Sequence, residues 1–198
     1  MGKDIETKCP YTNFKNKVMK YIGILRTPRE EYGGMPACPF VGAEVDKGKL
    51  MIDKFNPEQT SILDKVKELE ESDYDSALFI QVTDETISGE DTYAYQNFIN
   101  RTLRTNGYEH LKCICFNPND KQEVAGFNAR KDAPYFLINI ANKKVLAKAH
   151  KSLIGTKYFD NFEDKYLKYL NPGSFESTKI KVEEAKKKRI AKWLGYLK

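Results

Sequence analysis

The sequence predicts an α/β (α+β) sandwich in which a mixed sheet of about four strands is covered by helices. Four short apolar segments are typical of strands, and segments of helical periodicity separate the first three of them. Strands that alternate with helices imply at least one right-handed β-α-β crossover, with helices packed on the sheet. A ferredoxin-like arrangement is the specific topology that we expect.

The N-terminal half is predicted to contain two helices and two strands. Apolar residues recur at helical spacing in residues 12–25, and residues 49–55 form the first strand. Asn56 followed by Pro57 is typical of a helix start, so we expect the second helix to begin there. The continuous apolar run at residues 76–82 predicts a strand that is covered on both faces.

The C-terminal half is predicted to contain two more strands and two more helices. These elements are a helix over residues 92–105, strands over residues 111–116 and 135–141, and a helix from residue 143 to Gly155. The Asn106-Gly107 pair is a natural end for the first of these helices, and Asn142 can cap the second. A polar loop, residues 117–133, separates the two strands.

The basic charge of the chain is concentrated in its last twenty residues. Residues 179–198 contain eight basic and two acidic residues, a net charge of +6, whereas the whole chain carries +5. The rest of the chain therefore carries −1, which argues against a nucleic-acid-binding surface on it. We expect residues 1–170 to form one α/β domain and residues 171–198 a basic amphipathic helix. That helix either packs through Trp193 and Leu197 on the domain or on a second subunit, or binds a membrane surface, nucleic acid or an acidic partner.

Composition argues against a membrane or secreted protein. The chain has 198 residues, of which 40% are hydrophobic, and no apolar run approaches the roughly 20 residues of a transmembrane helix. The N-terminus lacks the apolar core of a signal peptide. We therefore expect a cytoplasmic protein with no transmembrane segment, whose four cysteines are thiols.

Cys38 is the first candidate catalytic residue, because it lies between Pro36 and Pro39 in the segment YGGMPACPF. A catalytic thiol needs a lowered pKa, which a helix N-terminus, a cation or a histidine can supply. His150 is a candidate for moving protons at such a site. The alternative is that Cys38 is a small apolar residue in a tight turn. The sequence leaves both readings open.

The polar loop at residues 117–133 is the second candidate. A loop of that length is usually functional or disordered. Asn117, Asn128 and Arg130 are able to hold a carboxylate or phosphate, because a guanidinium group binds such anions in a bidentate manner. Asp132 is a candidate base. The alternative is a solvated excursion without a ligand.

Two residues of the following strand extend this candidate site. Asn139 is polar within the apolar run YFLINIA, and a polar residue in such a strand needs a partner or a task. Tyr135 begins the same run and is a candidate substrate-binding residue.

Two further cysteines lie close together in the strand LKCICF. Cys113 and Cys115 share one face of that strand, since strand side chains alternate. With His110 they form an H-x-x-C-x-C pattern. Structural zinc usually takes four ligands from turns with C-x-x-C spacing, so we expect two core thiols and no metal.

Cys38-Pro39-Phe40, the strand SALFIQ and the segment CICFNPNDKQEVAGFNARKDAPYFLINIANKKVLAKA carry a resemblance to a known family. They resemble an uncharacterised bacterial family, domain of unknown function 1415, over residues 36–155. Its pattern has Cys-Pro-Phe-Ala, a later strand ending in Phe-His-Pro, an Ala-Gly pair, and Asn-Arg-Ser-Pro-Tyr-Pro before another strand.

This chain departs from that family pattern at two places. Phe116-Asn117-Pro118 has asparagine where the family has histidine, which weakens an acid-base role at that position. The segment from Arg130 to Tyr135 is one residue longer than its counterpart, while Ala125-Gly126 fits. The resemblance implies that the Cys38 turn and the long loop meet at one end of the sheet, and it implies no reaction.

Two hypotheses of function follow from these residues. In the first, the protein is an enzyme that acts on a small anionic metabolite in a pocket formed by Cys38 and the loop. Cys38 is then the nucleophile or redox thiol, Asp132 or His150 moves protons, and Asn139 forms the floor. In the second, the protein is a non-catalytic binding or adaptor module that uses its basic C-terminal helix. No P-loop, Rossmann glycine pattern or Ser-His-Asp set is present, so no cofactor is indicated.

Overall fold

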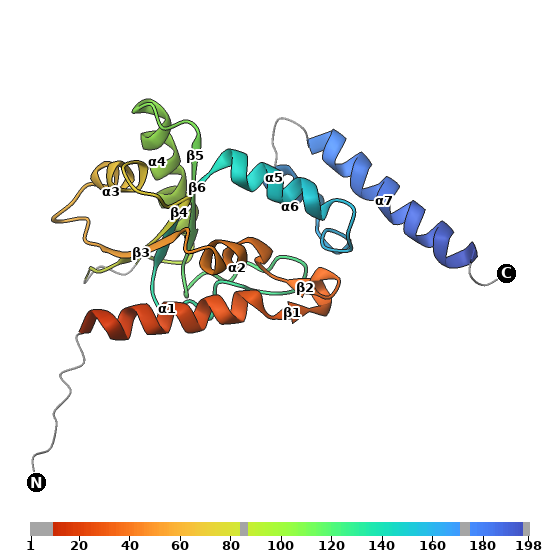
Figure 1. Ribbon diagram of the computed structural model, residues 1–198, viewed down its shortest axis with the longest axis horizontal. Coiled ribbons are helices and arrows are strands. Elements are labelled where there is room, and N and C mark those ends of the chain that lie inside the picture. Colours follow the sequence, from red (N-terminus) through yellow and green to blue (C-terminus); the bar gives the residue numbers. More distant parts are fainter. Residues whose placement is uncertain (1–9, 84–86, 171–174, 196–198) are drawn as a thin grey trace, which may run out of the picture.

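The structure is a computed structural model that describes residues 10–83, 87–170 and 175–195 (Figure 1). Its helices and strands alternate along most of the chain. In chain order the elements are α1 (Pro10–Arg26), β1 (Pro28–Arg29), the 3-10 helix η1 (Glu30–Tyr32), β2 (Met35–Pro36), α2 (Pro39–Asp46), β3 (Leu50–Phe55), α3 (Ile62–Glu70), β4 (Ser76–Gln81), α4 (Thr92–Thr105), β5 (Leu111–Phe116), β6 (Leu137–Asn142), α5 (Lys143–Leu153), α6 (Asp164–Leu170) and α7 (Phe175–Gly195).

The predicted sandwich is confirmed: a four-stranded mixed sheet is packed against helices. Its strand order is β3-β4-β6-β5, with β3 and β4 parallel and the other two pairings antiparallel. A ferredoxin-like sheet is built from split β-α-β units. Here β6 splits the unit β4-α4-β5, but β3 and β4 are direct neighbours, so the ferredoxin-like expectation is wrong.

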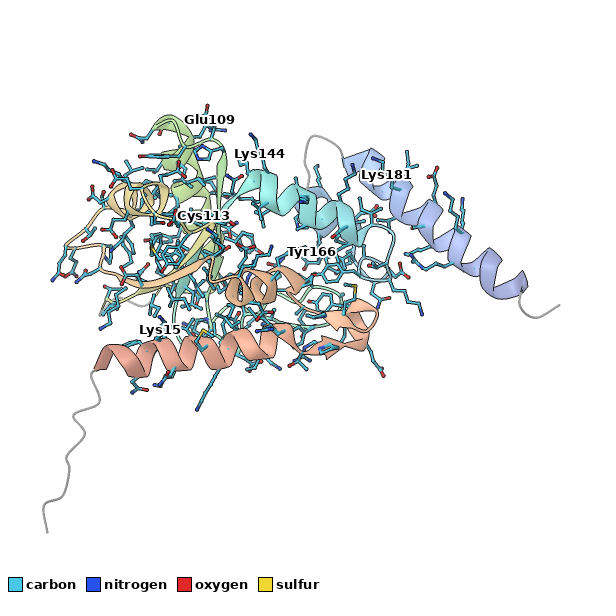
Figure 2. The ribbon with its side chains drawn as sticks, viewed as in Figure 1. Lys15, Glu109, Cys113, Lys144, Tyr166 and Lys181 are labelled. Atoms are coloured by element: carbon cyan, nitrogen blue, oxygen red, sulfur yellow. The ribbon has the colours of Figure 1, made fainter. Side chains whose placement is uncertain are left out.

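Helices cover both faces of the sheet (Figure 1). On one face, α3 and α4 pack against alternate strand residues such as Phe79, Ile138 and Ile140, all fully buried. On the other face, α1 packs against Leu78, Ile80 and other residues of opposite parity. Figure 2 shows Cys113 in the interior, whereas Lys15 on α1 and Lys181 on α7 lie at the outer surface.

Local sequence explains most element boundaries. Asn142 caps α5, because its side chain accepts a hydrogen bond from the backbone N–H of Lys144 at 2.9 Å. The expected start of α3 at Asn56 is wrong. The helix is capped by Ser61, which forms a reciprocal capping box with Asp64. Asn56 instead holds a turn, accepting from the backbone N–H of Glu58 at 2.9 Å.

Helix α7 lies against the body of the protein through one side. Val182 is buried in a third apolar cluster with Phe159 and Leu167. Arg189 pairs with Asp160 at 2.5 Å. It also donates to the backbone carbonyls of Gly155 and Thr156, in the turn that follows α5. Lys179 pairs with Asp164 of α6 as well, so the described contacts come from residues 179–189. The side chains of Trp193 and Leu197, on which the predicted packing depended, lie outside the described residues.

None of the described helices combines the length and the apolar character that crossing a bilayer requires.

Candidate functional site

A cavity of about 200 Å³ lies between the sheet and helices α1, α2 and α5. Most of its lining is apolar, with Ile22 from α1, Val41 from α2 and Leu146 from α5 facing Leu78 and Ile114 of the sheet. An apolar, partly enclosed hollow with a few polar groups is the usual form of a small-molecule site. The cavity is therefore the candidate functional site.

The floor of this cavity is hollow because the two central strands carry small residues there. Leu50, Ser76, Ala141 and Lys112 are successive partners across the four strands. Ser76 and Ala141 occupy the central strands β4 and β6, and the larger Leu50 and Lys112 occupy the edges. Asn139 lies two residues from Ala141 on the same face of β6. The space above these short side chains is what the three helices enclose.

Cys38 lines the cavity at the N-terminus of α2. The sequence predicted a rigid turn here, but an eight-residue helix begins at the next residue, Pro39. Burial raises the pKa of the Cys38 thiol, and the backbone N–H groups of Val41 and Phe40 act in the opposite direction. Because burial dominates, Cys38 is a thiol rather than a thiolate at neutral pH.

His150 reaches the same cavity from α5. Its ring lies edge-on to the ring of Phe40, with 5.7 Å between centroids, and 6.5 Å from that of Phe159. Burial, followed by the nearby charge of Lys112, lowers the pKa of His150 to about 4. The imidazole is therefore neutral at neutral pH and able to accept a proton.

Asn139 completes the set of predicted site residues that line the cavity. Its side-chain nitrogen donates to the backbone carbonyl of Ala77 at 3.0 Å, which supplies the partner that a polar residue in an apolar strand needs. The structure thus brings Cys38, His150 and Asn139 to one cavity, although they are far apart in the chain.

Three charged residues of the lining were missed by sequence reasoning. Glu44 of α2 exposes 9% of its surface, and its Oε2 has no hydrogen-bond partner among the described residues. Burial, then the neighbouring charge of Asp75, raises the pKa of the Glu44 carboxyl. Burial, then the charge of Lys143, lowers the pKa of Lys112. A signal for Lys112 was available, because it shares a strand face with Ile114 and Phe116.

The long loop does not contribute to this cavity, because residues 117–133 are absent from its described lining. Arg130 is instead held by three acceptors. Its Nη1 lies 2.6 Å from Asp120 Oδ2, 2.8 Å from Gln122 Oε1 and 2.9 Å from the hydroxyl of Tyr93. Asp120 is buried, so this is an ion pair of the protein interior.

The two loop asparagines also hold the protein together. The side-chain nitrogen of Asn117 donates to the carbonyls of Ile87 and Ser88 and to the hydroxyl of Thr92, at 2.8 to 3.0 Å. Asn128 donates to the carbonyl of Asp120 at 2.7 Å and accepts from two backbone N–H groups. Both amides tie the loop to itself or to the start of α4.

The last two predicted site residues lie outside the cavity as well. Asp132 is exposed. Tyr135 packs against Phe14 of α1 with the two rings tilted by 37° and 4.8 Å between their centroids, and Lys17 lies over the Tyr135 ring. The Cys38 turn and the loop were predicted to form one pocket, but only the Cys38 turn is part of the described lining of this cavity. The two segments do meet elsewhere: Tyr32 and Phe40 share an apolar cluster with Phe127, and the Tyr32 hydroxyl donates to Val124 O at 3.1 Å.

The H-x-x-C-x-C pattern is divided between two environments. Cys113 and Cys115 are fully buried in the core under α4, with 3.8 Å between their sulfur atoms. His110 pairs instead with Glu70, at 3.1 Å. Within residues 10–83, 87–170 and 175–195 there is no group of three or more potential metal ligands.

Comparison with family models, with curated proteins and with solved structures finds no match to this chain. The resemblance to domain of unknown function 1415 therefore stays a prediction.

Proposed function

We propose that this protein binds a small, largely apolar molecule in the cavity between the sheet and helices α1, α2 and α5. The observation that carries the proposal is the partly enclosed, mostly apolar hollow above Ser76 and Ala141. An apolar cavity of about 150 Å³ holds benzene, so one of about 200 Å³ admits a molecule of roughly eight non-hydrogen atoms.

The chemistry that the cavity supports is nucleophilic. If the protein is an enzyme, Cys38 is the nucleophile or redox thiol and His150 is its base. Burial holds both groups in their neutral forms, so the reactive thiolate forms only if a bound molecule lowers the pKa of the Cys38 thiol. Asn139 offers its amide to the substrate from the floor.

The residues that led us to expect an anionic substrate do not line this cavity. That expectation depended on Asn117, Asn128 and Arg130, which are bonded within the protein. An anion remains a possible ligand only through Lys112, the basic side chain among the described lining residues.

Benzyl alcohol tests the proposal, because it has the expected size and no charge. Two-dimensional NMR should show saturable shifts of the backbone amides of Ser76 and Asn139, with a Kd on the order of 1 mM for a ligand of this size. Ala141→Leu fills the hollow and should weaken binding at least about tenfold.

Ala147→Leu is the matched control, since Ala147 is exposed on α5 and the same carbon atoms are added there. It should bind benzyl alcohol like the unmodified protein. Equal binding by the Ala141→Leu variant would show that the alcohol sits elsewhere and would contradict the proposal.

A second candidate function is a non-catalytic binding or adaptor role for α7, with another copy of the chain as one partner. The observation that favours it is that Ile180 and Ile190 expose 55% and 58% of their surfaces among exposed lysines. Replacing both isoleucines with serine is cleaner than deleting α7, because deletion would uncover the cluster that contains Val182. Sedimentation of the two proteins should show self-association that the double variant loses. A monomeric unmodified protein would contradict the homo-oligomer.

A further inference from the structure

The unpartnered carboxyl of Glu44 indicates which kind of molecule the cavity accepts. We propose that the ligand is a primary amine with a small apolar body, and that Glu44 accepts a hydrogen bond from its ammonium group. This inference rests on the proposed function, because it concerns the ligand of the same cavity.

Glu44 lowers the stability of the unliganded protein, because it places a polar atom in the interior without a partner among the described residues. It is more than nine-tenths buried and lines the cavity, yet its Oε2 makes no hydrogen bond within the described part of the chain. A buried acceptor without a partner costs about 1–3 kcal/mol, and a charged one costs more. Such atoms are rare in native proteins, and each calls for an explanation such as a missing ligand.

The charges near Glu44 favour a cation over an anion at this end of the cavity. Asp75, which also lines the cavity, adds a second acidic group next to Glu44. Lys47 and Lys49 lie close enough to lower the pKa of Glu44, but neither lines the cavity. Among the described residues, neither Glu44 nor Asp75 is within 4.0 Å of a basic side-chain nitrogen.

The opposite end of the cavity carries the competing charge. Glu44 lies over the β3 side of the sheet, since its backbone carbonyl accepts from Lys49 just before β3. Lys112 lies on β5, the opposite edge strand. An ammonium group would therefore bind at the β3 side and a carboxylate at the β5 side. The middle of the cavity is apolar in both cases.

Three probes of one shape distinguish these cases: benzylamine, benzyl alcohol and benzoate. At pH 7 they are cationic, neutral and anionic. We expect benzylamine to bind at least about tenfold more tightly than benzyl alcohol, and benzoate to bind most weakly, because Glu44 and Asp75 repel it. Calorimetry or NMR titration measures the three dissociation constants.

Glu44→Gln tests the role of the carboxylate. It should reduce benzylamine affinity at least about tenfold and change benzyl alcohol affinity less than about twofold. Glu58→Gln is the matched control, because Glu58 is exposed in the turn before α3 and makes the same change of charge away from the cavity. It should leave all three constants unchanged. Asp75→Asn, at an exposed position, should reduce benzylamine affinity by a smaller factor than Glu44→Gln does. It is a second test of the charge effect in a protein that retains Glu44.

The outcomes separate the inference from the proposed function. If benzyl alcohol or benzoate binds in the cavity as tightly as benzylamine, or if Glu44→Gln leaves benzylamine unaffected, the amine inference is overturned and the proposed function stands. If none of the three probes binds, both are overturned.

Discussion

The cavity and the loop at residues 117–133 both contain polar residues that resemble a functional site, but they differ in whether these residues have partners inside the protein. In the loop, Arg130, Asn117 and Asn128 find their partners inside the protein. In the cavity, Glu44 has an atom without a partner, and His150 and Cys38 are held in their neutral forms by burial. Satisfied polar groups stabilise the fold, whereas unsatisfied ones raise its free energy and remain available to a ligand.

The largest effect that the comparison predicts is at Arg130. Arg130→Met should destabilise the protein by about 3 kcal/mol, because it leaves the buried carboxylate of Asp120 unpaired. Benzyl alcohol binding should not change. Urea unfolding measures the loss, and Lys121→Met at an exposed position is the control. If Arg130→Met kept normal stability but lost benzyl alcohol binding, Arg130 would be a ligand-binding residue rather than a structural one.

Asn117 should show the next largest effect. Asn117→Ala removes four hydrogen bonds from a residue that is 1% exposed, so we expect a loss of about 2 kcal/mol in the free energy of unfolding. Asn119→Ala, two residues later and exposed, should cost less than about 0.5 kcal/mol. Similar losses for the two variants would mean that the amide of Asn117 has no structural role.

Glu44 should behave in the opposite way to the loop residues. Glu44→Gln replaces a buried carboxyl by a neutral amide, so the free energy of unfolding at pH 7 should stay unchanged or rise by about 1 kcal/mol. A loss comparable with that of Arg130→Met would show that Glu44 has a partner in the folded protein.

His150 gives a test through pH. Its pKa in the folded protein is about 4, below the ordinary value of 6.5, so the unfolded chain binds this proton first. The stability that the neutral imidazole contributes is therefore present above pH 6.5 and is lost as the pH falls towards 4. His150→Gln should lose less stability than the unmodified protein over that range, as measured by urea unfolding. An NMR titration of the ring with a midpoint at 6.5 would contradict the burial argument.

The smallest expected effects concern the rate of thiol modification. Iodoacetamide should label Cys38 slowly at pH 7, with an apparent pKa above the ordinary value of about 8.5, because burial disfavours the thiolate. Cys113 and Cys115, both fully buried, should react only after unfolding. Peptide mass spectrometry distinguishes the three sites. Fast labelling of Cys38 at pH 7 would mean that the helix N-terminus prevails over burial.

The sequence predicted the sheet better than the segments between its strands. Strands such as 76–81 and 111–116 are apolar runs, and their burial is a local property of the chain. Helix α2 was missed because it is only eight residues long and follows a segment rich in glycine and proline, although Pro39 at its first position is a helix-start signal. The start of α3 was misplaced because Asn56 and Ser61 are both good caps, and only the structure decides between them.

The candidate site was predicted in part, for a physical reason. Cys38, Asn139 and His150 were chosen one at a time by residue type, and nothing in their spacing indicates that they share a cavity. Arg130 looked like an anion ligand because sequence does not reveal that Asp120 is its partner. The hollow itself depends on which small residues face each other across paired strands, and this requires the register.

The position of β6 has a consequence for how the protein is made. β6 lies between β4 and β5 in the sheet but follows both in the chain. On the ribosome, β3 and β4 can pair as soon as β4 emerges, whereas β5 must wait for its only strand partner in the described sheet. A nascent chain that stops before β6 therefore leaves one edge of β4 and both edges of β5 unpaired, and unpaired strand edges are prone to aggregation. We expect chaperones to bind the nascent chain during the interval between synthesis of β5 and synthesis of β6.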